Sequence, residues 1–559
     1  MAILLEGCTP YRQQDAEKYD RLRWWPGLTL SDLLDRAADI YPHKEAFVDG
    51  KCRLTFSEAR EKTDRLAIGL MDLGIKPLDR VLIQLPNWNE FVFVYFALQK
   101  IGAVTVLLID RYRQYEINHI AKMSGATTWI VARRYAKVDY LPIIDDVLKE
   151  SPQLKRVILA RAEGGEPFSD IDDLIGKNEL SEGNIRRLAE ARPDPMQIAH
   201  MGVTGGTTGI PKIVPRTHNS LVCSSEFCAR AWDMDIHDNC LLAGPIGHDL
   251  TFSKGLLGSV PTFGKITFLD TTDMEEVCKT IEAEKITVIV WVPTLSQRLL
   301  IYEKLGDFDL SSLRGIHCGG GASLPDMVRG VQEKLGAIFY NAYGGTEGMT
   351  TISRTNDDLE TILNTVGKPT CPYDTYKVVD PFGEDLPPDT PGELLLKGPG
   401  VFTGYYNNPT ENKLVFTQDG FFRTGDVAKI SREGYIVLTG RIKEMINRGG
   451  ESISATEIER LILDHPDVAQ VAVVPMPDPD LGEKVCAYIQ VMPKATLTFE
   501  DVISFLRGRK ASVLQLPQRI EFIDAFPYTK AGKLDKATLR EDIAQKVAEA
   551  GAQRGSAQK

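Results

Sequence analysis

Long apolar runs are missing from this chain of 559 residues. The strongest, 91–98 and 286–293, fall well short of the roughly 20 residues that a membrane-spanning helix needs. Residues 2–5 are apolar but too few for a signal peptide, and no basic segment precedes them. We therefore expect a soluble cytoplasmic protein with no membrane partner.

Cysteine pairs and basic runs are also missing. The nine cysteines are scattered, without CxxC pairs or clustered histidines, so neither a disulfide framework nor a structural zinc site is indicated. The formal net charge is −12, and no run of Lys and Arg could follow a nucleic-acid backbone. We expect reduced thiols and no nucleic-acid partner.

The apolar periodicity predicts an α/β fold. Helical spacing at 30–41, 57–73 and 90–101 alternates with short β-rich runs such as 80–85 and 127–131. Such alternation is typical of a mostly parallel sheet. The length is too great for one compact core, so a large domain with at least one smaller domain is expected.

A second α/β series and two smaller parts follow along the chain. Runs at 287–292 and 314–318 predict further buried strands, and strands at 376–379 and 393–396 lie among Pro and Gly turns, which indicates a β-rich subdomain. Beyond about residue 455 the order helix, strand, strand, helix predicts a small α+β domain.

The segment Thr204–Lys212 is the strongest candidate for a phosphate site. After a predicted strand it places three glycines, three threonines and a lysine within nine residues. Glycines let backbone N–H groups approach an anion, hydroxyls donate hydrogen bonds, and the lysine adds positive charge. A flexible Ser/Thr/Gly turn is the alternative. The P-loop pattern of ATPases is absent, because Ile210 and Pro211 separate Gly209 from Lys212.

Several further motifs accompany this segment in a fixed order. They are Tyr343-Gly-Gly-Thr-Glu-Gly348, Gly392-Glu-Leu, Gly404-Tyr-Tyr, Phe422-Arg-Thr-Gly-Asp426, Gly440-Arg441 and Thr529-Lys-Ala-Gly-Lys533. The ordered set resembles the adenylate-forming superfamily of acyl-CoA and aryl-CoA synthetases, adenylation domains and luciferases. The segment Ile213-Val-Pro-Arg-Thr-His218 is similar to that of aryl-acid activating enzymes of the 2,3-dihydroxybenzoate–AMP ligase type.

The resemblance implies a two-step reaction. A carboxylate attacks the α-phosphorus of ATP and releases pyrophosphate, and the acyl adenylate then acylates a thiol. It also implies a large AMP-binding domain over 1–440, made of two α/β sheet subdomains and a β-rich subdomain. A small mobile α+β domain would follow over 441–559. The partners would be a carboxylic acid and either CoA or an aryl carrier protein, with the chain a monomer or a homodimer.

The resemblance also implies an ATP site. The loop would bind the β and γ phosphates, with Thr207 and Thr208 as donors and Lys212 as charge. Glu347, with Thr208, would hold Mg²⁺, a cation that prefers carboxylate and phosphate oxygens. Asp426 would accept from the ribose hydroxyls. The full set is Thr204, Gly205, Gly206, Thr207, Thr208, Gly209, Lys212, Gly320, Gly321, Tyr343, Gly344, Thr346, Glu347, Asp426 and Arg441.

Lys533 is the catalytic residue that the resemblance implies, bridging the carboxylate and the α-phosphate. His248 would orient the acid at the pocket. The pocket residues would be His248, Asp249, Lys254, Gly319 and Gly320. Dihydroxybenzoate-type enzymes have asparagine where this chain has Asp249, so an Asp249–Lys254 pair would favour a different aryl or cyclic acid.

The second step implies motion of the small domain. Lys443 occupies the hinge position of the family, and Gly449 and Gly450 would line the thiol channel; a plain linker is the alternative. Of the two acceptors we prefer CoA, with a carrier-protein phosphopantetheine as the alternative. A non-catalytic protein that binds nucleotide or acyl adenylate is a different class of function, and the intact Lys533, Glu347 and Asp426 argue against it.

Overall fold

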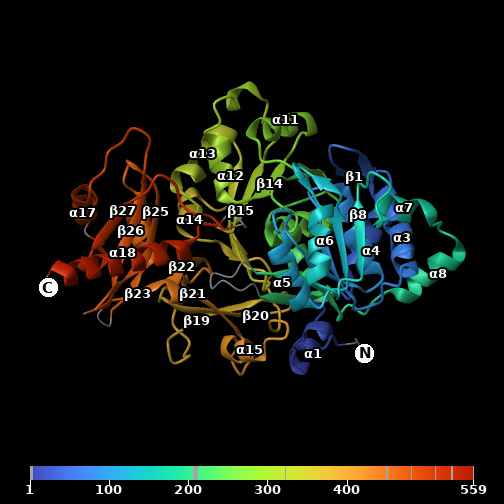
Figure 1. Cartoon of the computed structure of the whole chain (residues 1–559), viewed down its shortest axis with the longest axis horizontal. Coiled ribbons are helices and arrows are strands. Elements are labelled where there is room, and N and C mark those ends of the chain that lie inside the picture. Colours follow the sequence, from blue (N-terminus) through green and yellow to red (C-terminus); the bar gives the residue numbers. More distant parts are fainter. Residues whose placement is uncertain are drawn as a thin grey trace. The chain divides into compact units, whose positions relative to one another are not determined.

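The structure is a computed structural model and describes residues 4–204, 212–321, 323–448, 451–479, 481–509, 511–529 and 533–557. The chain divides into two compact units. The larger unit comprises the described residues of 1–205, 211–375 and 396–422, and the smaller unit those of 376–395 and 423–559. Figure 1 shows both units and labels many of their elements.

The larger unit contains a seven-stranded sheet of order β11-β10-β4-β3-β5-β8-β9. Its strands are β3 (Arg80–Gln84), β4 (Val104–Leu107), β5 (Thr128–Ala132), β8 (Arg156–Ala160), β9 (Ser169–Asp170), β10 (Ile198–Val203) and β11 (Ile213–Thr217). Neighbouring strands run parallel except for β10 and β11, which are antiparallel. This confirms the predicted parallel sheet.

A nine-stranded sheet of order β18-β17-β16-β15-β14-β12-β13-β1-β2 forms the second half of the larger unit. Its strands are β1 (Glu45–Val48), β2 (Arg53–Thr55), β12 (Asn239–Leu242), β13 (Lys265–Phe268), β14 (Val288–Trp291), β15 (Gly315–Gly319), β16 (Ile338–Gly344), β17 (Thr350–Ile352) and β18 (Lys368–Pro369). The central strands are parallel, and antiparallel pairs occur at both edges. Every residue of β14 is buried, as expected for an apolar strand covered on both faces.

Helices of the larger unit start and stop at local sequence signals. Thr29 and Thr55 form capping boxes with the side chains of Asp32 and Glu58, so α2 (Leu30–Ile40) and α3 (Phe56–Asp72) begin there. The other helices are α1 (Gln13–Arg21), α4 (Asn89–Lys100), α5 (Gln114–Ser124), α6 (Leu141–Glu150), α7 (Ile171–Lys177), α8 (Glu182–Ala191), α9 (His218–Ala231), α10 (Leu257–Ser259), α11 (Met274–Glu284), α12 (Pro293–Leu300), α13 (Pro325–Leu335), α14 (Leu359–Asn364) and α15 (Pro409–Val415). Figure 1 shows α12 and α13 beside β14 and β15.

Helix α4 explains the apolar run at 91–98. All eight of these residues are at most 3% exposed, and they belong to a core cluster that also includes residues of both sheets, such as Ile83 and Leu242. The run is therefore a buried core helix. Within the described part of the chain, no helix combines the length and the apolar character needed to cross a membrane.

Asn87, just before α4, joins the two sheets. Its side-chain amide lies 2.8–2.9 Å from the carbonyl oxygens of Leu242, Gly244 and Leu269, to which it donates. Its side-chain oxygen accepts a hydrogen bond from the backbone N–H of Ile246 at 2.9 Å. Asn87 is only 5% exposed and supplies hydrogen-bond partners to these backbone groups, of which the Leu242 carbonyl also accepts from the Leu269 N–H.

We expect Asn87→Ala to lower the free energy of unfolding by about 2–4 kcal/mol, because buried carbonyls lose their donor. Urea titration followed by tryptophan fluorescence measures the loss. Asn364→Ala, at an exposed helix end, is the control and should change stability by no more than about 0.5 kcal/mol. Equal and small losses in both variants would contradict this role for Asn87.

The smaller unit contains two further sheets. One is a four-stranded sheet of order β19-β20-β21-β22, most of which belongs to this unit. The other is a five-stranded sheet of order β24-β23-β26-β25, in which β27 also pairs with β26. The strands are β19 (Thr375–Val379), β20 (Gly392–Lys397), β21 (Phe422–Ile430), β22 (Ile436–Arg441), β23 (Met445–Arg448), β24 (Glu451–Ser454), β25 (Val468–Asp478), β26 (Gly482–Val491) and β27 (Arg519–Phe522).

Helices cover both faces of the five-stranded sheet. They are α16 (Ala455–Leu463), α17 (Phe499–Gly508) and α18 (Lys536–Ala557). Val471 and Val473 of β25 pack in one cluster with residues of α16 and α17, whereas Ala472 and Val474 pack in another with residues of α18. This period of two is that of a β-strand, and it confirms the predicted α+β arrangement. The predicted domain boundary at 440/441 falls inside the smaller unit and stays a prediction.

Candidate active site

Predicted site residues of the larger unit follow the carboxyl ends of parallel strands. Thr204 comes after β10, His248 and Asp249 after β12, and Gly320 after β15. In open α/β sheets this edge is where ligands bind, because the loops there are free of strand pairing. The predicted residues of each sheet therefore share one edge of that sheet although they are far apart in sequence.

The ends of the predicted phosphate loop are held together. The backbone N–H of Thr204 donates to the carbonyl of Lys212 at 2.9 Å, and the N–H of Lys212 donates to Oγ1 of Thr204 at 3.1 Å. Val203 and Ile213 pair in the antiparallel β10–β11 ladder just outside them. The other predicted loop residues, Gly205, Gly206, Thr207, Thr208 and Gly209, lie outside the described residues.

A chain of polar contacts links Lys212 to Glu347. Nζ of Lys212 forms an ion pair with Glu411 and lies 4.7 Å from the ring centre of Tyr405. The Tyr405 hydroxyl donates to Oε1 of Glu347 at 2.8 Å. Burial, followed by the charges of Glu347 and Glu411, raises the pKa of Tyr405, so its hydroxyl stays protonated and donates. The predicted phosphate and metal residues thus meet through Tyr405.

The Glu347 carboxylate is suited to serve as a magnesium ligand. Its Oε2 accepts no hydrogen bond from a described residue, so this oxygen is available to a hard cation. No group of three or more His, Cys, Asp or Glu side chains that could bind a metal occurs in the described part of the chain. One carboxylate oxygen cannot complete the coordination of Mg²⁺ alone. The ion would therefore take its remaining ligands from phosphate oxygens and water.

Arg216 holds the segment that carries Glu347. Its guanidinium donates to the carbonyls of Thr346 at 3.2 Å and Gly400 at 2.6 Å, and also to Ser220. The residue is 3% exposed, and burial lowers its pKa. Phe402 N–H also donates to the Glu347 carbonyl at 2.8 Å. Neither Arg216 nor Tyr405 was assigned a role from sequence, although both stand in motifs that resemble the family.

Two glycines allow this segment to pack closely. A Cβ at Gly202, on β10, would lie 2.2 Å from the Thr346 methyl carbon. A Cβ at Gly348 would lie 2.2 Å from the Gly400 carbonyl, and its φ of 103° is itself unfavourable for other residues. Thr346 therefore lies directly against the strand that leads into the phosphate loop.

Tyr343, Gly344 and the 319–321 segment lie on neighbouring strands. Tyr343 and Gly344 end β16 and pair with Thr351 and Thr350 of β17. Gly319 ends β15 beside Ala342 of β16, and a Cβ on it would be 3.5 Å from a side-chain carbon of Leu250. Gly320 has a φ of 82°, which favours glycine. Gly321 is exposed and adjoins it. The predicted adenine and acyl residues are thus adjacent.

The segment with the predicted pocket residues continues into a π-helix, Leu250–Leu256. Nδ1 of His248 accepts from the backbone N–H of Leu250 at 3.3 Å. Lys254 is 5% exposed. The Asp249–Lys254 pair weighed on sequence grounds is not observed, since neither side chain forms an ion pair or hydrogen bond with a described residue. A π-helix aligns residues five apart differently from an α-helix, and π-turns are frequent at functional sites.

The remaining predicted residues belong to the smaller unit. Nε of Arg441 lies 2.8 Å from Oδ1 of Asp426, and the two residues pair across β21 and β22. Asp426 is 4% exposed, whereas the Arg441 side chain is 46% exposed. The ion pair orients the carboxylate that would bind ribose. Both residues therefore have defined positions within one hairpin.

Lys533 is exposed and closes a short loop. Its carbonyl accepts from the Thr529 N–H at 2.7 Å, and its own N–H donates to Oγ1 of Thr529 at 3.2 Å. Lys443 lies in the short 3₁₀ turn Ile442–Glu444, before β23. Gly449 and Gly450 lie outside the described residues. The hinge and channel roles therefore stay predictions.

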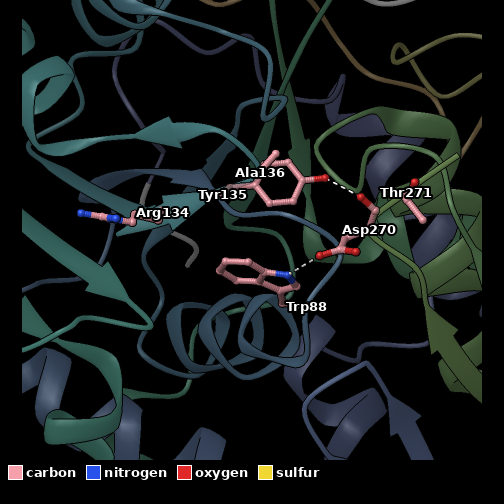
Figure 2. Close-up of a pocket in the computed structure, with 6 residues that line it drawn as sticks. All are labelled: Trp88, Arg134, Tyr135, Ala136, Asp270 and Thr271. Carbon is pink, nitrogen blue, oxygen red and sulfur yellow. Dashed lines mark hydrogen bonds between the residues drawn. The ribbon is translucent and has the colours of Figure 1, made fainter. Parts of the chain in front are cut away.

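Two pockets in the larger unit are lined by other residues. The first, of about 340 Å³, is lined by Trp88, Arg134, Tyr135, Ala136, Asp270 and Thr271. Figure 2 shows Trp88 and Tyr135 pointing toward Asp270 from two different elements, and they donate to its Oδ2 at 3.1 Å and its carbonyl at 2.6 Å. A second pocket, of about 240 Å³, adjoins it and includes Asn87 and Asp110. None of the predicted site residues lines either pocket.

Two family models match this chain, one in its longer N-terminal part and one near its C-terminus. A model described as AMP-binding enzyme matches residues 34–406, and one described as AMP-binding enzyme C-terminal domain matches residues 457–533. The chain belongs to the AMP-binding enzyme family. The predicted adenylate-forming enzyme of the ligase class is thereby confirmed, and Lys533 is the last residue of the second match.

Relatives of this AMP-binding enzyme include aryl-acid activating proteins. It is 35% identical over 97% of its length to 2,3-dihydroxybenzoate-AMP ligase of Bacillus subtilis, of which 99% is covered. It is 34% identical over 97% to a salicylyl-CoA synthase / salicylate adenylyltransferase of a Streptomyces species, 98% covered. It is also 33% identical over 96% to the salicyl-AMP ligase / salicyl-S-ArCP synthetase of Mycobacterium tuberculosis, 94% covered.

Solved structures share the fold over nearly the whole chain. Apo MbtA of Mycobacterium smegmatis superposes with a TM-score of 0.72 at 30% identity, covering 96% of this chain and 98% of that one. ATP-bound MatB of Rhodopseudomonas palustris gives a TM-score of 0.82 at 26% identity, covering 92% and 99%. The predicted large and small α/β domains are confirmed by these matches.

We expect Tyr405→Phe to lower kcat/KM for Mg·ATP by about 10- to 100-fold, since the carboxylate of Glu347 loses a charge-assisted hydrogen bond of about 1.5–3 kcal/mol. Steady-state adenylation at varied Mg·ATP measures this. The neighbouring Tyr406, whose hydroxyl bonds no described residue, offers the matched control Tyr406→Phe. Equal kinetics in the two variants would rule out the proposed role of Tyr405.

Proposed function

We propose that this enzyme adenylates an aryl carboxylic acid with Mg·ATP and then loads the aryl group onto a carrier-protein phosphopantetheine. The contact chain from Lys212 through Tyr405 to Glu347 carries the proposal. It places a cation suited to phosphate and a carboxylate suited to Mg²⁺ beside one another. Both are needed where a carboxylate must approach a triphosphate of like charge.

In the first step the substrate carboxylate oxygen forms a bond to the α-phosphorus, and the bond from that phosphorus to the bridging oxygen of pyrophosphate breaks. Lys212 neutralises the departing phosphates, and Lys533 neutralises charge on the carboxylate and α-phosphate. Glu347 would hold Mg²⁺, which would supply further charge neutralisation at the phosphates. Asp426, oriented by Arg441, accepts hydrogen bonds from the ribose.

In the second step a thiol sulfur bonds to the acyl carbon, the bond from that carbon to the AMP oxygen breaks, and the thiol proton is released. On sequence grounds CoA is the preferred acceptor. The names of the relatives favour the carrier protein instead, because they include two 2,3-dihydroxybenzoate-AMP ligases and a salicyl-S-ArCP synthetase. Two relatives, one named as a CoA synthase and one as a CoA ligase, keep CoA as the second candidate.

Substrate-dependent ATP–pyrophosphate exchange over hydroxybenzoic, aminobenzoic, heteroaromatic and alicyclic acids tests the first step. We expect exchange with an aryl acid, and Lys533→Ala should lower its rate by about 10²–10³ because the developing charge loses a cation. Lys494→Ala, which removes an exposed lysine of the same unit, is the control. Undiminished exchange in Lys533→Ala would refute the catalytic assignment, and no exchange with any acid would favour the non-catalytic class.

The acceptor is tested with preformed aryl adenylate. A holo aryl carrier protein and free CoA are compared at matched concentrations, with thioester formation followed by mass spectrometry. We expect aryl transfer to the carrier protein with the higher kcat/KM. A higher kcat/KM for CoA would reverse the choice of acceptor and leave the first step unaffected.

A further inference from the structure

Lys536 is the centre of a partly buried ion triad in the smaller unit. Its Nζ lies 2.7 Å from Oε1 of Glu459 and 3.2 Å from Oε2 of Glu444. All three side chains are only 17–18% exposed. Breaking such a group by removing one partner leaves a charge without compensation in a poorly solvated place. The three residues are therefore held together strongly.

The charges within the triad depend on one another. Burial alone would lower the pKa of Lys536, but the two carboxylates raise it overall. Burial raises the pKa of Glu459, against the opposing effect of Lys536. Glu459 is also fixed by the backbone N–H of Val473, which donates to its Oε1 at 2.6 Å. Glu459 thus anchors Lys536 to α16 and β25.

The second partner, Glu444, connects the triad to the turn that contains the predicted hinge residue. It is the last residue of the turn Ile442–Glu444 and directly follows Lys443, the predicted hinge. On the other side, Lys536 begins α18 only three residues after Lys533. Between them, Leu534 pairs with Tyr528, and the N–H of Asp535 donates to the carbonyl of Pro527 at 2.9 Å. These contacts leave little freedom between Lys536 and the loop that carries Lys533.

We propose that Lys536 is a positioning residue that joins the segment after the hinge to the catalytic-lysine loop. Through Glu444 it holds the backbone that follows Lys443, and through its place in the chain it holds Lys533. The segment that follows Lys443 and the loop that carries Lys533 then move as one body when the small domain turns. The proposal rests on the proposed function, because it assumes that Lys533 serves adenylation and that Lys443 is the hinge.

Glu444→Gln tests the link with the smallest change, since it removes one charge and keeps the size of the side chain. We expect the rate of ATP–pyrophosphate exchange at saturating substrates to fall about 10- to 100-fold, because Lys533 is misplaced. KM for ATP should change less than about twofold, and so should acyl transfer from preformed aryl adenylate, which does not need Lys533. Amide hydrogen exchange of residues 442–448 should become faster.

Matched variants separate positioning from stability. Lys536→Met should reproduce the selective loss of exchange, and Lys536→Arg should restore most of it. Glu459→Gln keeps an oxygen for the Val473 N–H and should lower exchange less than Glu444→Gln does. If Lys536→Met fails to fold, the result for Glu444→Gln alone tests the proposal.

Equal losses of both half-reactions in Glu444→Gln, in proportion to its loss of thermal stability, would overturn the proposal. So would unchanged exchange in that variant. Lys533→Ala, assayed alongside, distinguishes failure of the underlying function: if Lys533→Ala retains full exchange, Lys533 is not the catalytic residue. If only Lys533→Ala is impaired, the link through Glu444 is refuted and the catalytic assignment stands.

Discussion

The buried guanidinium of Arg216 holds together three stretches of the larger unit near the site. A cation that is 3% exposed needs hydrogen-bond acceptors, and Arg216 finds them in the carbonyls of Thr346 and Gly400 and in Ser220. These acceptors come from three separate stretches of the chain. One carries Glu347, and another leads to Tyr405. The contact of Tyr405 with Glu347 exists because Arg216 fixes both stretches.

The same logic applies to several other charged groups of this protein. Lys212 is paired with Glu411 and lies on the Tyr405 ring, Asp426 is paired with Arg441, and Lys536 is placed between two carboxylates. Each pair orients a group relative to the backbone rather than adding much net stability, since the cost of desolvation offsets most of the attraction. Orientation is what an adenylation site requires, because its catalysis depends on charge in fixed places.

Much of the fold is predictable from local patterns. Runs such as 80–85 and 287–292 correspond to strands β3 and β14, and helical spacing at 30–41 corresponds to α2. The π-helix after Asp249, the hairpin of β23 and β24, and helix α18 were not predicted. A π-turn differs from an α-helix only in its hydrogen-bond register, to which apolar spacing is insensitive. Helix α18 packs against residues of β25 and β26, which are distant in sequence, so tertiary packing determines it.

The candidate site was predictable only as a set of motifs. Glu347 and Lys212 stand out in sequence because Gly and Thr surround them, but Tyr405 acts through contacts with residues 58 and 193 positions away. Conversely, Asp249 and Lys254 are close enough in sequence to suggest a pair, but the structure shows no ion pair between them. Spacing along the chain does not determine side-chain direction unless the type of helix is known.

The π-helix Leu250–Leu256 has a consequence for how this enzyme can evolve. Each of its turns holds one residue more than an α-helix would need. Deleting a single residue would return the segment to α-helical register and rotate the side chains that precede the deletion by about 100° relative to those that follow it. A new set of side chains would then face the strands, with no lining residue replaced. If His248 and Asp249 bind the acid, as the sequence predicts, the backbone of this segment offers a route to new acid specificity that leaves Glu347, Lys212 and their supports untouched.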